Sequence, residues 1–384
     1  MHRVYLDNNA STDLHPEVLE DMMPYLRDRF GNPSSPHWPG QEARKAVEKA
    51  RGQLAHLVNC DPEEVIFTSS ATESNNTAIK GVAASRAERA KGIVTTIVEH
   101  PSVLMPCYYL EQQGFGVTCL DVDRHGCLDL AAVESSFTNE TCLLSVMHAN
   151  NETGTLFPVA EIGRLARGKG VVFHCDAAQA VGKVPVDFKA SEIDLMSLSG
   201  HKFYGPKGIG ALIVRKGLKF HPLLHGGAQE QNRRAGTENV AGIVGLGKAC
   251  ELAAKTVAKE SLRLENLRDR LEQGILEMIP DVRRNGDVDH RLPNTSNMSF
   301  LGVDSEKLLF ALDQTGIAVS SVSACSSGTL KTSRVLEAMG AVEGTRVGTL
   351  RFSLGMATSG EDVNLVLEVL PNLVQRMRAS GSKG

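Results

Sequence analysis

Apolar and polar positions alternate with a helical period in several parts of the chain. Over 41–57, apolar residues recur every three or four positions on one face, namely at Ala43, Val47, Ala50, Leu54 and Leu57. A second helix is predicted from the serines at 69–70 through residue 83, because serine side chains cap helix N-termini. The longest helical run covers 242–279 and is predicted to lead out of a first structural unit.

Short apolar runs lie between these helical stretches and predict strands. They are VIFT at 65–68, GIVTTIV at 92–98, LLSVMHA at 143–149, VVFHCDA at 171–177, DLMSLSG at 194–200 and GIGALIV at 208–214. Strands that alternate with helices in this way indicate a mainly parallel sheet covered by helices on both faces. Beyond 279 the strands and helices are shorter, which predicts a smaller α+β unit.

Composition and charge narrow the class of protein. The 384 residues are 42% apolar and 22% charged, as in ordinary globular enzymes. The formal net charge of −4 argues against a nucleic-acid or anionic-membrane partner held by bulk electrostatics. No stretch approaches the roughly 20 apolar residues that span a bilayer, and the start MHRVYLDNNAST lacks the apolar core of a signal peptide. We therefore expect a cytoplasmic protein without membrane or direct nucleic-acid partners.

The cysteines show no disulfide or zinc-site spacing, and we expect no metal site. There are eight of them, at Cys60, Cys107, Cys119, Cys127, Cys142, Cys175, Cys250 and Cys325. Seven are expected to be buried as small apolar side chains. Cys325 differs, because it lies in the small, polar run SSVSACSSGT and is expected to be more accessible.

The run SLSGHKFYGPKGIGALIV places Lys202 among small residues directly before a predicted strand. An amine held in a small cavity can form a Schiff base with a carbonyl cofactor. A solvated loop lysine would have much the same local sequence. The functional interpretation therefore depends on what else the chain supplies.

Other chemical groups stand near the ends of predicted strands, where open α/β sheets place their ligands. Ala71 and Thr72 open a helix whose N-terminus favours a phosphate, although any capped helix begins in this way. His100 follows a strand, where a structural histidine is also common. Asp176 ends an apolar strand and needs a positive partner, either a pyridinium nitrogen or a structural cation.

Two more polar residues, Ser199 and His201, flank the lysine turn and can donate to the same phosphate. An amine, an aspartate for a ring nitrogen, a phosphate site and an imidazole together predict a site for pyridoxal 5′-phosphate (PLP), which acts as an electron sink.

Ten motifs then give a specific resemblance. They are YLDNNAST at Tyr5, FGNPSSPH at Phe30, FTSSATESNN at Phe67, EHPSV at Glu99, NNETGT at Asn150, HCDAAQAVGK at His174, SGHKFYGPKGIG at Ser199, GGAQEQNRRAGTEN at Gly226, SACSSG at Ser323 and RFSLG at Arg351. In this order the chain resembles the class V, fold-type I PLP enzymes and, among them, the NifS/IscS-type cysteine desulfurases.

The resemblance implies an α/β fold and a division of the chain. A large cofactor-binding domain would cover 15–255, with a mainly parallel mixed sheet flanked by helices. The remainder, 1–14 and 256–384, would form a smaller α+β domain that carries the cysteine loop at about 320–335.

The resemblance also implies a role for each residue that binds the cofactor. Lys202 would form the Schiff base and move protons, Asp176 would pair with the ring nitrogen, and Gln179 would hydrogen-bond the ring hydroxyl. The phosphate would be held by Ala71, Thr72, Ser199 and His201. Thr237 would reach the phosphate in a neighbouring subunit, which makes a homodimer the expected unit.

For the reaction, the resemblance implies a desulfurase acting on L-cysteine. His100 would stack on the ring and act as an acid or base, and Asn151 and Arg351 would bind the substrate, the arginine through its carboxylate. Cys325 would take the sulfur as a persulfide, leaving alanine. The sulfur would pass to an acceptor such as an iron–sulfur scaffold or a transfer-RNA thiolation enzyme.

Departures from the family pattern leave alternatives open. Val322 replaces a glycine before the cysteine, LKTSRVL replaces Leu-Glu-Pro-Ser-x-Val-Leu after it, and Ala228 replaces a glycine of the GGGQE motif. A selenocysteine lyase or another class V aminotransferase would share most of these residues, although transamination needs no thiol at Cys325. A non-catalytic assembly scaffold would not need Lys202.

Overall fold

The computed structural model describes residues 2–321, 333–341 and 347–381. Its larger sheet has seven strands in the order β2-β8-β7-β6-β5-β3-β4. Their bounds are β2 Val65–Thr68, β3 Gly92–Thr96, β4 Gly116–Leu120, β5 Thr141–Met147, β6 Val172–Asp176, β7 Leu195–Ser199 and β8 Gly210–Val214. The five strands from β7 to β4 are parallel, and β8 is antiparallel to both of its neighbours. The predicted α/β class with a mainly parallel mixed sheet is confirmed.

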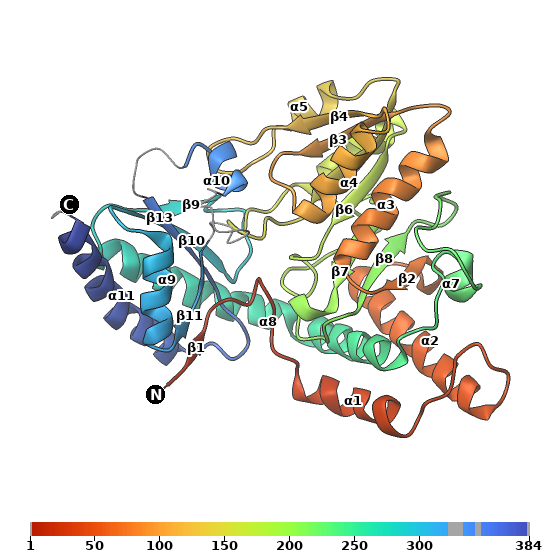
Figure 1. Ribbon diagram of the computed structural model, residues 1–384, viewed down its shortest axis with the longest axis horizontal. Helices are drawn as coiled ribbons and strands as arrows, with labels where there is room; N and C mark the ends of the chain where they lie inside the picture. Colours follow the sequence, from red (N-terminus) through yellow and green to blue (C-terminus); the bar gives the residue numbers. More distant parts are fainter. Residues whose placement is uncertain (1, 322–332, 342–346, 382–384) are drawn as a thin grey trace.

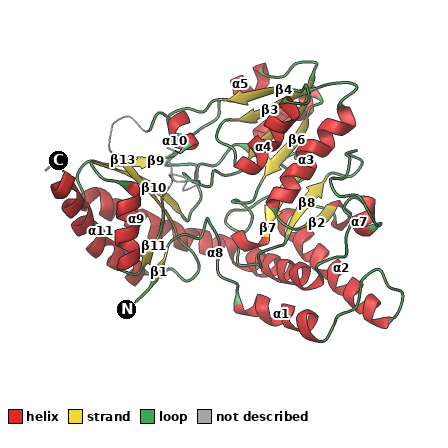
Figure 2. Ribbon diagram, in the orientation of Figure 1, coloured by secondary structure: helices red, strands yellow, loops and turns green. Residues whose placement is uncertain are grey.

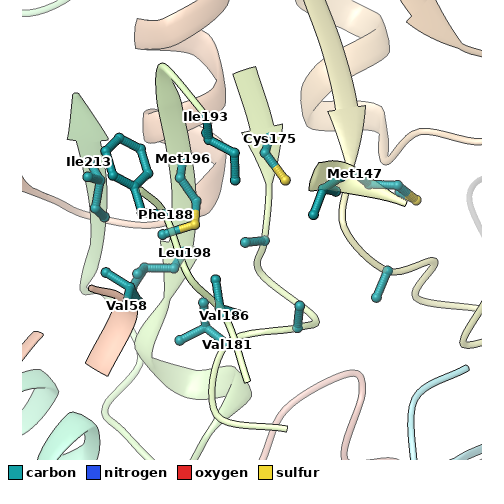
Figure 3. Close-up of a cluster of buried hydrophobic side chains, with 14 of the residues drawn as sticks. Val58, Met147, Cys175, Val181, Val186, Phe188, Ile193, Met196, Leu198 and Ile213 are labelled. Atoms are coloured by element: carbon teal, nitrogen blue, oxygen red, sulfur yellow. The ribbon is translucent and has the colours of Figure 1, made fainter. Parts of the chain in front are cut away.

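Consecutive apolar residues in these strands explain why the sheet is buried on both faces. Side chains alternate between faces along a strand, so two consecutive residues of one strand belong to two different hydrophobic clusters. One cluster contains Ile66, Ile93, Leu143, Val172, Leu195 and Leu212. The other contains Phe67, Val94, Leu144, Phe173, Met196 and Ile213. Figure 3 shows part of the second cluster, where Phe188 lies between Met196 and Ile213 and Val58 lies beside Leu198.

Helices cover both faces of this sheet (Figure 2). The first cluster is completed by α3 Ala71–Arg86 and α4 Pro101–Glu111. The second is completed by α2 Trp38–Val58, α6 Val159–Lys169 and the first part of α8 Val240–Met278. Helices α1 Pro16–Arg27 and α5 Leu130–Ser135 add Val18, Met22 and Val133 to the second cluster, and the short α7 Gln229–Asn232 precedes α8.

The observed helix ends differ slightly from the sequence prediction, for local reasons. Helix α2 begins three residues earlier than predicted, because His37 caps it through Nδ1 and a proline in the first turn is compatible with helix geometry. It ends at Val58, and the next residue, Asn59, caps it in the left-handed conformation at φ 53°. Helix α3 begins where predicted, since the hydroxyl of Ser70 accepts from the Glu73 N–H at 3.3 Å.

The smaller unit has a four-stranded antiparallel sheet in the order β12-β13-β10-β9. Its strands are β9 Val282–Asn285, β10 Thr295–Leu301, β12 Ser320–Ser321 and β13 Val347–Ser353, and a separate parallel pair joins β1 Val4–Tyr5 to β11 Ile317–Ala318. Its helices are α9 Ser305–Gln314, α10 Arg334–Ala338 and α11 Gly360–Gly381.

A third hydrophobic cluster belongs to this smaller unit. It combines Val4 and Leu6 with residues from Leu264 onward, so the first residues of the chain pack with its C-terminal part. The division into 15–255 and the remainder stays a prediction. Helix α10, in contrast, packs against the larger unit. Helix α8 runs from one half of the molecule to the other (Figure 1). In the described part of the chain, no helix has both the length and the apolar character needed to cross a membrane.

Candidate active site

A cavity of about 420 Å³ lies where the carboxyl ends of β6 and β7 face the N-terminus of α3 and a residue of β13. Most of the predicted site residues line it together. They are Ala71, Thr72, His100, Asn151, Asp176, Gln179, Ser199, His201, Lys202 and Arg351. Residues separated by up to 280 positions in the sequence therefore share one cavity.

Asp176 is the last residue of β6 and is 6% exposed. Its Oδ2 accepts from Asn75 Nδ2 at 2.7 Å, and its Oδ1 accepts from the Ala178 N–H at 3.0 Å. Asn75 comes from the second turn of α3, directly behind the helix N-terminus. The aspartate is thus fixed in the cavity wall by two donors.

Lys202 ends the turn Gly200–Lys202 that follows β7. Its Nζ donates to the main-chain oxygens of Asn9 at 2.7 Å and Ala10 at 2.9 Å. The pKa of Lys202 is lowered to about 8, first by burial and then by the Arg351 charge, against the opposing effect of Asp176 and Asp7. An amine with such a pKa is partly neutral at physiological pH and can act as a nucleophile.

His100 caps α4 through its Nδ1, which accepts from the Ser102 N–H at 3.1 Å. Desolvation by the surrounding protein lowers the pKa of His100, with Asp176 opposing and Lys202 adding to the shift. In the neutral ring the proton then lies on Nε2, as assigned from this hydrogen bond. The Ser102 hydroxyl lies 2.8 Å from Nδ1 and also accepts from Asn75, so a hydrogen-bonded chain joins His100 to Asp176.

The opposite end of the cavity suits a phosphate. Ala71 and Thr72 form the first turn of α3, where main-chain N–H groups lack helical partners. Ser199 and His201 face them from the end of β7. Burial and, after it, the charges of nearby lysines lower the pKa of His201 to about 4. His201 is therefore a neutral donor at physiological pH.

Arg351 reaches the cavity from β13 of the smaller unit. Its Nη1 donates to the main-chain oxygen of Asn151 at 2.9 Å, and its Nη2 pairs with Asp7 Oδ1 at 2.6 Å. Its Nε is buried and makes no hydrogen bond within the described residues. A buried, unpaired N–H on a cation suits the carboxylate of an amino-acid substrate.

One predicted residue that the structure describes, Thr237, does not line this cavity. Thr237 lies between α7 and α8, is exposed, and does not line the site of its own chain. Cys325 lies outside the described residues, as do Val322 and the other changes beside it up to 332.

The prediction that the remaining seven cysteines are buried is wrong for two of them. Cys119 and Cys127 are half-buried, because β4 is an edge strand and Cys127 lies in a loop.

Sequence reasoning missed several residues of the site. Asn9 and Ala10 line the cavity and hold Lys202, and Asn75 and Ser102 hold Asp176 and His100. Each stands in a motif that the sequence displays, YLDNNAST, FTSSATESNN or EHPSV. The sequence shows each motif, but it does not show which residue elsewhere in the fold each of these side chains contacts.

Comparison with known proteins gives the family. The model of the family "Aminotransferase class-V" matches residues 4–366. The chain belongs to the class V aminotransferase family. Among curated relatives of this class V chain, a cysteine desulfurase of Trichormus azollae is 52% identical over 379 residues, covering 99% of this chain and 94% of that protein. The cysteine desulfurase IscS of Dictyoglomus turgidum is 49% identical, covering 98% and 95%.

Solved structures agree with this family assignment. A NifS-like protein superposes with a TM-score of 0.92 at 38% identity and covers 98% of this chain and 100% of its own. A structure described as SspA in complex with cysteine superposes with a TM-score of 0.79 at 36% identity, covering 91% and 98%. The class V chain therefore has the NifS-like fold over nearly its whole length.

Class V enzymes use PLP, and the residues of the cavity fit this cofactor. A buried carboxylate at Asp176, a half-buried amine at Lys202 and a helix N-terminus at Ala71 line one space. These are the groups that a pyridinium, a carbonyl and a phosphate require.

Proposed function

We propose that this chain is a cysteine desulfurase, which converts L-cysteine to L-alanine with PLP and receives the sulfur on Cys325. The observation that carries the proposal is the single cavity in which Lys202, with a pKa of about 8, lies with Asp176 and Arg351. Full-length relatives that carry this name at about half identity support it.

The cofactor would be held by residues already fixed in the wall. PLP supplies an electron sink for the substrate carbon when it is bound. Asp176 would accept from the ring nitrogen, and Gln179 would donate to the ring oxygen. The phosphate would take N–H and O–H donors from Ala71, Thr72, Ser199 and His201.

The substrate would be bound and deprotonated by this chain's own groups. Arg351 Nε, which has no hydrogen-bond partner here, would donate to the substrate carboxylate, with Asn151 beside it. Lys202 Nζ would carry protons to and from the substrate, since its lowered pKa lets it do both near neutral pH. His100 would stack on the ring and offer its Nε2 proton.

Cys325 would complete the reaction. Its thiolate would attack the substrate sulfur, the carbon–sulfur bond would break with its electrons moving to the carbon, and that carbon would be protonated to give alanine. One cysteine and one enzyme thiol thus give one alanine and one persulfide, with no external oxidant. The persulfide would pass to an acceptor protein such as an iron–sulfur scaffold or a transfer-RNA thiolation enzyme in the cytoplasm.

A homodimer is part of the proposal. Thr237 is exposed and lies away from its own cavity, which supports a role for its hydroxyl at the phosphate of a second copy. Light scattering of the purified protein should give twice the chain mass. A fully active monomer would contradict this part.

The test of the function is a matched pair of Cys325 and Cys127 variants. Wild-type protein with PLP and L-cysteine should form alanine, and a peptide containing Cys325 should gain one sulfur by mass spectrometry. Cys325→Ser should lose the adduct and sulfide release, since a hydroxyl is barely ionised at neutral pH. Cys127→Ser is the control, because the Cys127 thiol donates to Asp287 and has a pKa of about 12. An adduct on another cysteine, or full activity of Cys325→Ser, would overturn the carrier role.

A further inference from the structure

Lys183 is a buried amine that the reaction above does not use. It ends the HCDAAQAVGK motif, is 9% exposed and makes no ion pair with a carboxylate of the described residues. Burial lowers the pKa of Lys183 well below its usual value, and the charges of Lys202 and Arg351 lower it further. Burying an amine without a counter-charge is costly, so its contacts should indicate a purpose.

Both contacts of the amine are with side-chain oxygens. Nζ donates to Gln179 Oε1 at 2.5 Å and to Asn9 Oδ1 at 2.8 Å. Gln179 lies four residues earlier in the same turn and lines the cavity, whereas Lys183 lies behind it and lines a second, smaller cavity. Lys183 therefore supports the cavity wall from outside.

These contacts fix the amide of Gln179 in one orientation. The Lys183 amine donates to the Gln179 oxygen and so holds that end of the amide. On the other side, Gln179 Nε2 donates to the main-chain oxygen of Asn9 at 2.9 Å, and a carbonyl only accepts. The second N–H of Gln179 Nε2 is then the donor that remains for the cavity.

The same Asn9 oxygen also accepts from Lys202 Nζ at 2.7 Å. The Asn9 side chain is held in turn, since its Nδ2 donates to Thr295 Oγ1 at 2.9 Å and its Oδ1 accepts from Lys183. The buried Lys183 amine thus contacts both Gln179 and Asn9, the residue whose main-chain oxygen accepts from Lys202.

We propose that Lys183 is a positioning residue, which holds Gln179 with an N–H donor toward the cofactor's ring oxygen and holds Asn9 under Lys202. This inference rests on the proposed function and names a residue that acts only through others. Without Lys183, the Gln179 oxygen loses its donor, and of these two contacts only the one to the Asn9 carbonyl still holds the amide.

Lys183→Met in the full chain reconstituted with PLP tests this. Methionine has similar length but no N–H donor. We expect the midpoint of the pH titration of the visible absorption band to rise by about one pH unit, because a ring oxygen without its donor holds the proton on the Lys202 nitrogen more tightly. The dissociation constant of PLP should rise about tenfold. Lys189→Met, which removes a half-exposed lysine paired with Asp61 at 2.7 Å, is the control and should change neither value.

A double variant separates positioning from general destabilisation. Gln179→Ala alone should shift the midpoint by a similar amount, and adding Lys183→Met to it should add little more. Independent, additive shifts would overturn the inference. If Lys183→Met does not fold, Gln179→Ala decides, since an unchanged midpoint in that variant is equally fatal.

The result also separates this inference from the proposed function. Wild-type protein that binds PLP but forms no alanine from cysteine would overturn the function. Wild-type protein that forms alanine, with an unshifted Lys183→Met titration, would overturn only the role of Lys183.

Discussion

The cavity has two unlike walls. The sheet wall consists of Asp176, Ser199 and Lys202 at the strand ends, facing the first turn of α3. The arginine wall consists of Arg351 and Asn9, which come from opposite ends of the chain, and Asp7 pairs with Arg351 without lining the cavity itself. Adjacent parallel strands place the sheet wall by main-chain register, whereas side-chain contacts across more than 340 positions place the arginine wall.

This contrast between the walls shows which part of a site can be predicted from a single sequence. A strand end followed by a polar residue is a local pattern, so Asp176, Ser199 and the α3 N-terminus follow from chain periodicity alone. The pairing of Arg351 with Asp7 depends on how the smaller unit docks, which no local pattern specifies. We expect changes in the sheet wall to alter the chemistry and changes in the arginine wall to alter substrate binding.

The largest effect is expected in the sheet wall at Lys202. Lys202→Ala removes both the amine that binds the cofactor carbonyl and the group that moves protons. Loss of a general acid–base alone costs about 10² to 10⁴ in rate, so turnover should fall at least that far and the visible band should be lost. Absorption spectroscopy and alanine formation measure both. A variant that keeps the band would break the assignment of the amine.

Asp176→Asn should have the next largest effect. The amide keeps the shape and the hydrogen bond from the Ala178 N–H, but it removes the charge opposite the ring nitrogen. One preorganised electrostatic contact is worth about 10² to 10³ in rate, so kcat should fall by that factor with some cofactor retained. Near-normal kcat would mean that Asp176 only supports the fold.

The sequence predicted much of the sheet wall but few of the residues that hold it in place. The helix at 41–57 and the strand ends followed from apolar periodicity, and ten site residues were brought to one cavity. Asn75, which holds Asp176 from 101 positions away, was missed because its contact is tertiary. For the same reason the sequence predicted no role for Lys183. The roles of all the site residues, Thr237 and Cys325 included, stay predictions.

Both walls affect how the rate of PLP binding to Lys202 depends on pH. Only the neutral Lys202 amine attacks a carbonyl, and its pKa is about 8. The capture rate of PLP by the apoprotein should therefore rise about tenfold per pH unit below pH 8 and level off above it. Stopped-flow absorbance measures this rate.

An Arg351 variant tests whether the arginine wall contributes to the lowered pKa of Lys202. Its charge lowers the pKa of Lys202, so Arg351→Met should move the midpoint of the rate profile upward. An unchanged midpoint would show that the arginine wall has no electrostatic effect on the sheet wall.

The smallest effect is expected at Asp7, which holds Arg351 Nη2 at 2.6 Å and competes with a substrate carboxylate for the same guanidinium. Asp7→Asn keeps an oxygen acceptor there and removes the competing charge. KM for L-cysteine should fall by about two- to fivefold, the range of a partly exposed ion pair, with kcat nearly unchanged. Asp7→Ala removes the acceptor as well, so the guanidinium loses its orientation and KM should rise. If both variants change kcat and leave KM alone, the arginine wall takes part in the chemistry and the distinction between the two walls fails.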